Sequence, residues 1–236
     1  MINKVLVNSE GNKYYYKNGD FHCSEGSIKE KDIKDGRIKT NKDEELICFD
    51  AGFIDNLAKI KRGPAIINQK DFGAIISTTG ISSGSTVVEA GTGSGALSLN
   101  LANIGCKLIS YENRKEFYEI AEENFNNLNF KIEIKNKDIY EGIAEKEIDL
   151  IVLDLLEPWK VLKHAENALK SGAFLAVYLP TITQVIELVK EIRKYNLYLW
   201  KVSETIEREW HVEGLKVRPH NQILGHTAFL VFLRKY

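Results

Sequence analysis

Segment 87–97 reads VVEAGTGSGAL and places three glycines between two runs of apolar residues. The run before the glycines is continuously apolar, as in a buried strand, and the apolar residues after them recur at helical spacing. Glycines let the backbone turn tightly and approach a ligand, and the following helix presents unpaired N–H groups at its start. The segment therefore predicts a strand, a tight turn and a helix that bind a ligand rich in oxygen atoms.

Strand-like and helix-like runs alternate from Ile66 onward, which is typical of a parallel sheet with helices on both faces. The expected strands are 86–90, 107–111, 130–135, 148–153, 173–178, 197–206 and 227–233. The expected helices are 94–104, 114–126, 159–169 and 181–195. The last two strands are separated only by an irregular stretch around RPHNQILGH, so we expect them to pair antiparallel. The predicted fold is an α/β, Rossmann-like sheet of seven strands, mostly parallel, with the last strand antiparallel.

The region before residue 50 has a different pattern, with short strand-like runs separated by turns. Asn18-Gly19 and Asp35-Gly36 favour positive backbone φ angles and so indicate tight hairpins. A basic loop at 59–64 contains a Gly-Pro pair that breaks regular structure. We therefore expect a small β-rich N-terminal domain at 1–60 and a Rossmann-like domain at 61–236.

Composition and charge limit the function classes. The chain has 236 residues, with 32 basic and 33 acidic side chains and a net charge of -1, so any nucleic-acid site must be a local basic patch. No segment approaches the roughly 18 to 20 apolar residues of a membrane-spanning helix, and the N-terminus lacks the pattern of a secretion signal. Three scattered cysteines argue against a disulfide framework. We expect a cytoplasmic protein.

Acidic residues at two further strand ends indicate what the glycine turn binds. Glu112 ends the next predicted strand, at a separation that suits a carboxylate accepting hydrogen bonds from two ribose hydroxyls. Asp138 follows the third strand and either accepts from an exocyclic amine, such as adenine N6, or caps the short segment after it. Gly91, Gly93 and Ala96 also satisfy the dinucleotide pattern, so the turn alone does not separate a nicotinamide cofactor from S-adenosylmethionine.

The fourth predicted strand, IDLIVLD, delivers a carboxylate to the same edge of the sheet. Its continuous apolar character indicates burial, and it ends in Asp154, followed by LLEPW. Burying a carboxylate is costly if the role is only structural. We therefore interpret Asp154 as a functional acid in the ligand crevice, with a helix-leading cap as the alternative.

The motifs VVEAGTGSGALSL, SYENR, KDIYEGI, VLDLLEPW and RPHNQILGHTAFL together resemble one family. They look like the class I S-adenosylmethionine-dependent tRNA (adenine-N1)-methyltransferases that modify position 58 of the T loop. The resemblance runs from about Arg62 to the C-terminus, and the DLLEPW and RP…GHT segments are its most specific parts. It implies the seven-stranded methyltransferase sheet, S-adenosylmethionine as cofactor, tRNA as partner and a homotetramer.

The resemblance also implies roles for individual residues. Asp154 would meet the substrate base and orient it. The residues that would hold the cofactor are Glu89, Gly91, Thr92, Gly93, Ser94, Gly95, Ala96, Leu97, Glu112, Asp138, Ile139 and Asp154.

This chain departs from the family pattern at two places. Leu156 replaces the proline of the usual DLPEPW, which leaves both acids in place. In the loop RGPAIINQKD, family members commonly have a glutamine and a Tyr-Pro pair where this chain has Ala65, Asn68 and Gln69. Asn68 cannot stack on a base as a tyrosine would, so Gln69, Lys70 and Asp71 are the candidates for positioning in this loop, with Gln69 as the catalytic one.

Adenine N1 lies on the pairing edge of the base, so the adenosine must leave its contacts before it reacts. Phosphate contacts elsewhere must offset that cost. The candidates are Lys59, Lys61, Arg62, Lys70, Arg208, Lys216, Arg218 and His220, with Arg62, Lys70, Arg218 and His220 as the expected substrate-binding residues. No metal is expected, because His220 and His226 have no cysteine or carboxylate at ligand spacing.

Three other functions stay open from the residues. A methyltransferase acting on a protein carboxylate or a small molecule would share the cofactor half and differ after Asp154. A nicotinamide-dependent oxidoreductase fits the glycines and Glu112, but no Tyr-x-x-x-Lys pair follows. A non-catalytic partner subunit would be expected to lose the glycines and acids, which are all present here.

Overall fold

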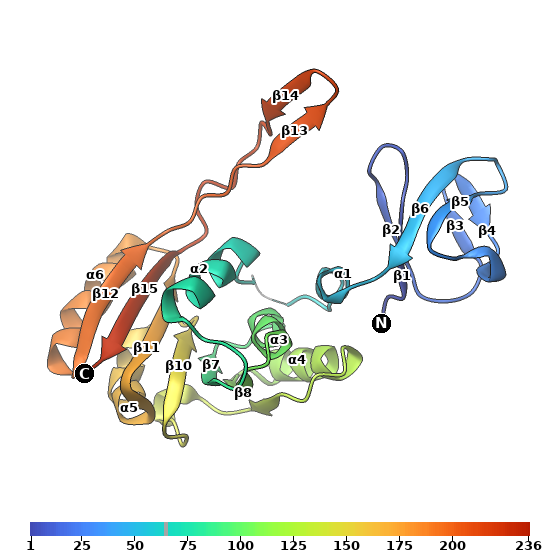
Figure 1. The fold of residues 1–236 in the computed structure, drawn as a ribbon. Helices are drawn as coiled ribbons and strands as arrows, with labels where there is room; N and C mark the ends of the chain where they lie inside the picture. The colour runs from blue at the N-terminus through green and yellow to red at the C-terminus, as the bar shows by residue number, and fades with distance from the viewer. Residues whose placement is uncertain (64–65) are drawn as a thin grey trace. The chain divides into compact units, whose positions relative to one another are not determined.

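The computed structural model describes residues 1–63 and 66–236, and the chain divides into two compact units, Met1–Lys61 and Arg62–Tyr236 (Figure 1). The first unit contains an antiparallel sheet of order β2-β1-β6-β5 and a separate hairpin, β3-β4. Its elements are β1 (Lys4–Val7), β2 (Lys13–Tyr16), β3 (Phe21–Cys23), β4 (Gly26–Ile28), 3-10 helix η1 (Glu30–Asp32), β5 (Gly36–Lys39), β6 (Glu45–Asp50) and α1 (Phe53–Leu57). Alternate residues of the strands, such as Leu6, Ile38 and Leu46, form its core.

The second unit is built on a seven-stranded sheet of order β12-β15-β11-β10-β7-β8-β9. Its strands are β7 (Thr86–Ala90), β8 (Lys107–Tyr111), β9 (Glu133–Lys135), β10 (Ile148–Leu153), β11 (Leu169–Leu179), β12 (Leu197–Ser203) and β15 (Phe229–Lys235). Strand β15 pairs antiparallel with both β11 and β12, whereas the other pairs are parallel. The expected Rossmann-like sheet with a reversed last strand is confirmed.

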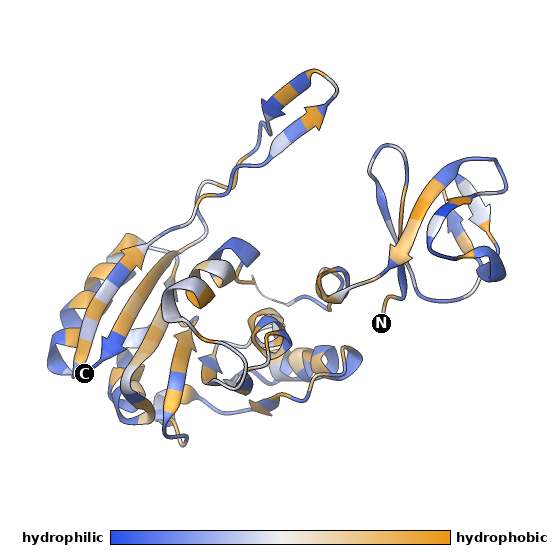
Figure 2. Cartoon of the chain, in the orientation of Figure 1, coloured by the Kyte–Doolittle hydropathy of each residue, from blue (hydrophilic) through white to orange (hydrophobic). Residues whose placement is uncertain are grey.

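Helices cover both faces of this sheet (Figure 1). They are α2 (Gln69–Thr79), α3 (Ala96–Asn103), α4 (Lys115–Asn127), α5 (Leu162–Ala168) and α6 (Ile182–Glu191), with 3-10 helices η2 (Ile139–Glu141), η3 (Pro158–Val161) and η4 (Ile192–Lys194). Side chains of α2 and α3 belong to one hydrophobic cluster, and those of α5 and α6 belong to another. The inner strands β10 and β11 are hydrophobic along most of their length, because both of their faces are covered (Figure 2).

Several elements differ from the sequence-based expectation. Strand β9, at one edge of the sheet, covers only the second half of 130–135. The helix expected at 159–169 begins as the 3-10 turn η3, which starts at Pro158, and its α-helical part ends where β11 begins. The helix expected at 181–195 also ends in a 3-10 turn, η4. Helix α2 was not expected.

The largest difference lies between β12 and β15, where an irregular stretch was expected. Strands β13 (Trp210–Glu213) and β14 (Lys216–Pro219) form a two-stranded antiparallel hairpin there, which extends away from the seven-stranded sheet (Figure 1). Gly214 has a φ of +55° in its two-residue turn, a conformation that glycine adopts at little cost. The polar and apolar residues of the hairpin alternate, so the sequence did carry a strand signal.

Candidate active site

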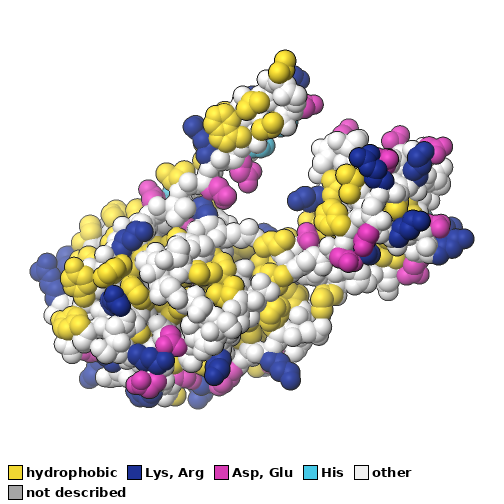
Figure 3. Space-filling view, in the orientation of Figure 1, with side chains coloured by type: hydrophobic (Ala, Val, Ile, Leu, Met, Phe, Trp, Pro, Cys, Tyr) yellow, Lys and Arg dark blue, Asp and Glu magenta, His cyan; other side chains and the backbone are white. Residues whose placement is uncertain are grey.

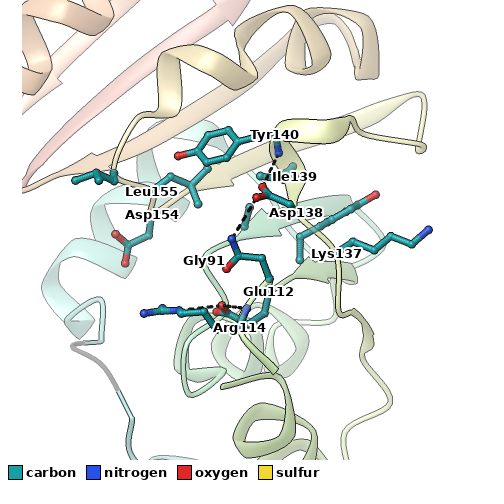
Figure 4. A pocket seen from close by; sticks show the side chains of 13 residues that line it. Gly91, Glu112, Arg114, Lys137, Asp138, Ile139, Tyr140, Asp154 and Leu155 are labelled. Atoms are coloured by element: carbon teal, nitrogen blue, oxygen red, sulfur yellow. Dashed lines mark hydrogen bonds and ion pairs between the residues drawn. The ribbon is translucent and has the colours of Figure 1, made fainter. Parts of the chain in front are cut away.

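The carboxyl ends of the neighbouring parallel strands β7, β8, β9 and β10 surround a cavity of about 260 Å³ (Figure 4). This is the edge at which open α/β sheets bind their ligands. Five of the predicted cofactor residues line it, namely Gly91, Glu112, Asp138, Ile139 and Asp154. The fold thus brings together acids that lie up to 42 positions apart in the sequence, from Glu112 to Asp154.

The glycine turn between β7 and α3 packs closely against its surroundings. Gly91, Gly93 and Gly95 have φ angles of +87°, +56° and +79°. A Cβ on Gly91 would lie 2.1 Å from the backbone oxygen of Asp154, and one on Gly95 would lie 2.4 Å from the ring of Phe125. At these two positions both the backbone conformation and the available space therefore require glycine.

A buried polar network supports the turn from below. The carboxyl of Glu89 accepts hydrogen bonds from the hydroxyls of Ser98 and Ser110, the latter at 3.2 Å, and Ser110 in turn contacts Thr92 at 2.6 Å. Burial raises the pKa of Glu89 to about 8, although the two hydroxyls oppose this shift. Glu89 is therefore largely protonated at neutral pH, and it lies beneath the turn rather than among the residues that line the cavity.

Glu112 follows β8 and connects this strand to the glycine turn. Its Oε2 accepts a hydrogen bond from Gly93 N at 2.9 Å, and its Oε1 accepts from Arg114 N at 3.0 Å. A longer ion pair joins Oε1 to Arg114 Nε at 3.3 Å. These donors occupy three of about four lone-pair positions on the carboxylate. Among the described residues, one acceptor position of this carboxylate has no donor, which leaves it for a ligand hydroxyl.

Asp138 takes the capping role that the sequence offered as one of two alternatives. Its Oδ1 accepts from Tyr140 N at 2.9 Å and so caps η2. Its Oδ2 accepts from the side-chain amide of Asn113 at 3.3 Å, at the wall of the cavity. Ile139, the next residue, is buried and provides an apolar surface beside this carboxylate.

Asp154 lies directly after β10, where its backbone N–H donates to Ala90 O at 2.9 Å and so fixes its place beside the turn. Burial raises the pKa of Asp154 to about 6, while the charge of Arg114 lowers it and that of Glu112 raises it. Arg114 was not singled out from the sequence, although it lies within the SYENR motif. It lines the cavity together with Lys137, and its position three residues after the end of β8 is the signal that could have identified it.

The residues predicted to bind substrate lie elsewhere. Gln69 is the first residue of α2 and is exposed, and Arg62 is exposed as well. Arg218 and His220 line a separate groove of about 450 Å³ at the hairpin β13-β14, together with Glu209 and His211. Of the three positions at which this loop departs from the family, Ala65 lies outside the described residues, as does the neighbouring Pro64.

The prediction for Lys70 needs correction. Its side chain is only 7% exposed, and its Nζ lies 2.8 Å from Asp71 Oδ1 and 2.6 Å from Thr227 Oγ1. An ammonium group that is buried and already paired is not available to an RNA phosphate. The sequence pattern of basic residues did not distinguish this lysine from the exposed ones.

The residues around the cavity fit an adenosine-containing, cationic cofactor. Ser94 Oγ is buried in the turn without a hydrogen-bond partner among the described residues, which leaves a polar group for a ligand to satisfy. Glu112 and Asp138 provide acceptors for ribose hydroxyls and for an exocyclic amine. Thr92, Ala96 and Leu97 are buried around the turn and fix its shape.

Residues 1–63 and 66–236 contain no group of three or more His, Cys, Asp or Glu that could hold a metal ion. None of their helices is both long and apolar enough to cross a membrane.

The seven-stranded sheet and the cavity define a class I S-adenosylmethionine-dependent methyltransferase. A family model described as the tRNA methyltransferase complex GCD14 subunit matches residues 59–217. The chain therefore belongs to the TrmI/GCD14 family of tRNA (adenine-N1)-methyltransferases. This confirms the resemblance inferred from the motifs.

Individual relatives agree with this assignment. The chain is 33% identical to the tRNA (adenine(57)-N(1)/adenine(58)-N(1))-methyltransferase TrmI of Methanocaldococcus jannaschii, over 98% of this chain and 94% of that protein. It is 37% identical to the tRNA (adenine(58)-N(1))-methyltransferase TrmI of Thermus thermophilus, over 92% of this chain and 89% of that protein.

Two solved structures extend the similarity over the fold. The crystal structure of the tRNA (m1A58) methyltransferase TrmI from Aquifex aeolicus has a TM-score of 0.84 and 27% identity, covering 99% of this chain and 96% of that one. An S-adenosylmethionine-dependent O-methyltransferase from Thermotoga maritima has a TM-score of 0.89 and 27% identity, covering 99% and 92%.

Proposed function

We propose that this protein transfers a methyl group from S-adenosylmethionine to N1 of adenosine 58 in the T loop of tRNA. The observation that carries the proposal is the position of Asp154, which lies at the carboxyl end of β10 and against the glycine turn. Gly91, Glu112, Asp138 and Ile139 would hold the cofactor in the same cavity. The family to which the chain belongs supports the same reaction.

Methyl transfer to adenine N1 depends mainly on how the base is oriented toward the methyl group. S-adenosylmethionine supplies an electrophilic methyl group when it is bound. Adenine N1 already carries a lone pair, so the attack needs no strong base. Asp154 would accept a hydrogen bond from the N6 amine, align N1 with the methyl group and stabilise the positive charge that the base acquires. The same carboxylate can accept an N6 proton afterwards.

The target adenosine must be unstacked from the T loop before it reacts, at a cost of a few kcal/mol. Contacts with tRNA phosphates would offset this cost. Arg218 and His220 are suited to this role, because they lie with His211 in one groove of the exposed hairpin. Arg62 is exposed at the start of the second unit and is a further candidate.

The raised pKa of Asp154 predicts the pH dependence of methyl transfer. The carboxylate is the active form, and it is lost as the pH falls through about 6. With both substrates well below their KM values, the rate reports the free enzyme and is expected to fall about ten-fold per pH unit below pH 6. A cation bound beside a carboxylate lowers its pKa, so the pKa in kcat should lie below that in kcat/KM. A pH profile that is flat between 5 and 7 would contradict this role for Asp154.

The reaction is tested directly by nucleoside mass spectrometry. Unmodified tRNA is incubated with the protein and S-adenosylmethionine, digested and analysed for 1-methyladenosine, and the modified position is mapped from fragments. We expect 1-methyladenosine at position 58, and the same experiment shows whether position 57 is modified too. Methylation of a protein or small molecule, but not of tRNA, would overturn the proposal.

The hairpin supports a second proposal, that the protein is a homotetramer. Trp210 is the cross-strand partner of Pro219, and Val212 is that of Val217, so these four apolar side chains share one face of the hairpin. Apolar side chains of the hairpin lie on the surface (Figure 3). Val212 is 69% exposed. An isolated two-stranded hairpin is marginally stable in water, and an exposed apolar face favours association.

We place a second copy of the chain on this apolar face, with the protein in the cytoplasm beside its tRNA substrate. Light scattering should give a mass of about four times 26.8 kDa. A monomer or a dimer at micromolar concentration would contradict the tetramer, since one self-complementary face alone joins only two copies.

A further inference from the structure

A buried ion pair lies at the start of α2, outside the cavity described above. Lys70 Nζ and Asp71 Oδ1 are 2.8 Å apart, and their side chains are 7% and 0% exposed. Neither side chain is needed for the cofactor contacts, and neither lines the cavity. The pair therefore needs a separate explanation.

Two hydroxyl groups complete the network around this pair. Thr227 Oγ1 accepts from Lys70 Nζ at 2.6 Å and donates to Asp71 Oδ2 at 2.7 Å. The phenol of Tyr178 also donates to Asp71 Oδ2, at 3.3 Å. Tyr178 belongs to β11, and Thr227 lies two residues before β15. The network thus connects the first turn of α2 to the C-terminal end of β11 and to the segment just before β15, which meet at one edge of the sheet.

The sheet register places this network beside Asp154. Leu153 pairs with Val177 in the parallel ladder of β10 and β11, so Asp154 and Tyr178 are the next neighbours along it. Register partners in a parallel ladder point to the same face of the sheet. Tyr178 packs with the cluster that contains the side chains of α2. Asp154 therefore lies on the same face of the sheet as Tyr178, whose phenol donates a hydrogen bond to Asp71.

Stability alone is a poor explanation of such a pair. Removing two charges from water costs several kcal/mol for each ion, and apolar residues of similar size would stabilise the fold equally well or better. A buried and fully hydrogen-bonded network instead fixes a unique arrangement of the elements that it joins. Burial raises the pKa of Tyr178 to about 12, so its phenol stays a neutral donor within the network at neutral pH.

We propose that Lys70, Asp71 and Thr227 are positioning residues for methyl transfer, because they hold the Tyr178 phenol and the first turn of α2 beside Asp154. This inference rests on the proposed function. The network would act on the target base through Tyr178, which neighbours Asp154 along the ladder and donates to Asp71 at the start of α2. In this proposal Lys70 holds Asp71 and Thr227 in place and does not contact an RNA phosphate.

The test removes one hydroxyl and measures turnover separately from binding. Thr227→Val keeps the shape of the side chain but deletes both of its hydrogen bonds. We expect kcat for tRNA methylation to fall about ten-fold to a hundred-fold, the range that small misplacements in an active site produce. The Kd for S-adenosylmethionine should stay near wild type, whereas the melting temperature should fall by several degrees, because the buried Lys70 and Asp71 each lose a partner. Thr227→Ser restores the hydroxyl and should return kcat to within about three-fold of wild type.

Two further variants separate positioning from folding. Thr79→Val is the matched control, since Thr79 also donates from its hydroxyl, to Ile75 O at 2.8 Å, but at the far end of α2. It should leave kcat unchanged. Tyr178→Phe should lower kcat as Thr227→Val does, and combining the two should cost no more than the larger single effect, because both act through one network. If Thr227→Val is unfolded, Tyr178→Phe and Thr227→Ser carry the test.

Three results would overturn the inference, two of them in kcat alone. One is wild-type kcat in Thr227→Val or Tyr178→Phe; the other is a double variant whose loss is the product of the two single losses. A proportional loss of cofactor affinity and turnover would also overturn it, since that result indicates a damaged fold. Wild-type protein that fails to methylate tRNA would instead overturn the proposed function, so the two failures can be distinguished.

Discussion

Asp154→Asn is expected to lower kcat by about a hundred-fold to a thousand-fold, while the Kd for S-adenosylmethionine changes by less than about three-fold. The amide keeps the shape of the side chain and one acceptor oxygen, but it lacks the negative charge that stabilises the methylated base. Single-turnover methylation of tRNA measures the first quantity. Isothermal titration calorimetry with the cofactor measures the second.

Asp149→Asn is the matched control for this variant. Asp149 lies in the same strand, β10, but at the opposite end, where it accepts a hydrogen bond from Thr86 N at 2.8 Å and pairs with Lys170 at 2.5 Å. Its replacement should leave kcat within about three-fold of wild type, because this carboxylate is remote from the cavity. Equal losses of cofactor binding and turnover in Asp154→Asn would mean that Asp154 is structural.

Gly91→Ala is expected to abolish cofactor binding at the glycine turn and turnover with it. The added methyl group would lie 2.1 Å from Asp154 O, and the residue would keep a φ of +87° that alanine rarely adopts. The backbone conformation costs about 1 to 3 kcal/mol and the steric overlap about 1 to 3 kcal/mol more. Relief of the overlap moves Asp154 or the turn, and either movement disturbs the cavity. Calorimetric binding and denaturant unfolding check both effects.

Gly84→Ala separates the two causes. Gly84 has a φ of +88°, nearly the value at Gly91, but a Cβ there would meet nothing within 4 Å. The control should therefore lose only the conformational part of the stability, about 1 to 3 kcal/mol, and should bind the cofactor normally. If Gly91→Ala behaves like Gly84→Ala, close packing against Asp154 is not what the turn requires.

The sequence by itself determined the architecture and the acids of the site. Alternating strand and helix runs predict a sheet whose strands share one carboxyl edge, so acids placed at consecutive strand ends must converge. Glu112 and Asp154 could be identified in this way because each directly follows a strand-like apolar run, and Asp138 because it closely follows the strand-like run FKIEIKN. The glycines were predictable for a similar reason, since their conformation is a local property of the chain.

Only the tertiary structure decided which charged side chains are buried and what they contact. Arg114 pairs with Glu112, Lys70 pairs with Asp71, and the Asp71 carboxylate meets Thr227 across 156 positions of the chain. A sequence pattern reports the polarity of a residue and its local spacing, but burial depends on segments brought together by folding. Lys70 and Arg218 look alike in the sequence for this reason, yet one is held in a buried network and the other lies exposed on a hairpin.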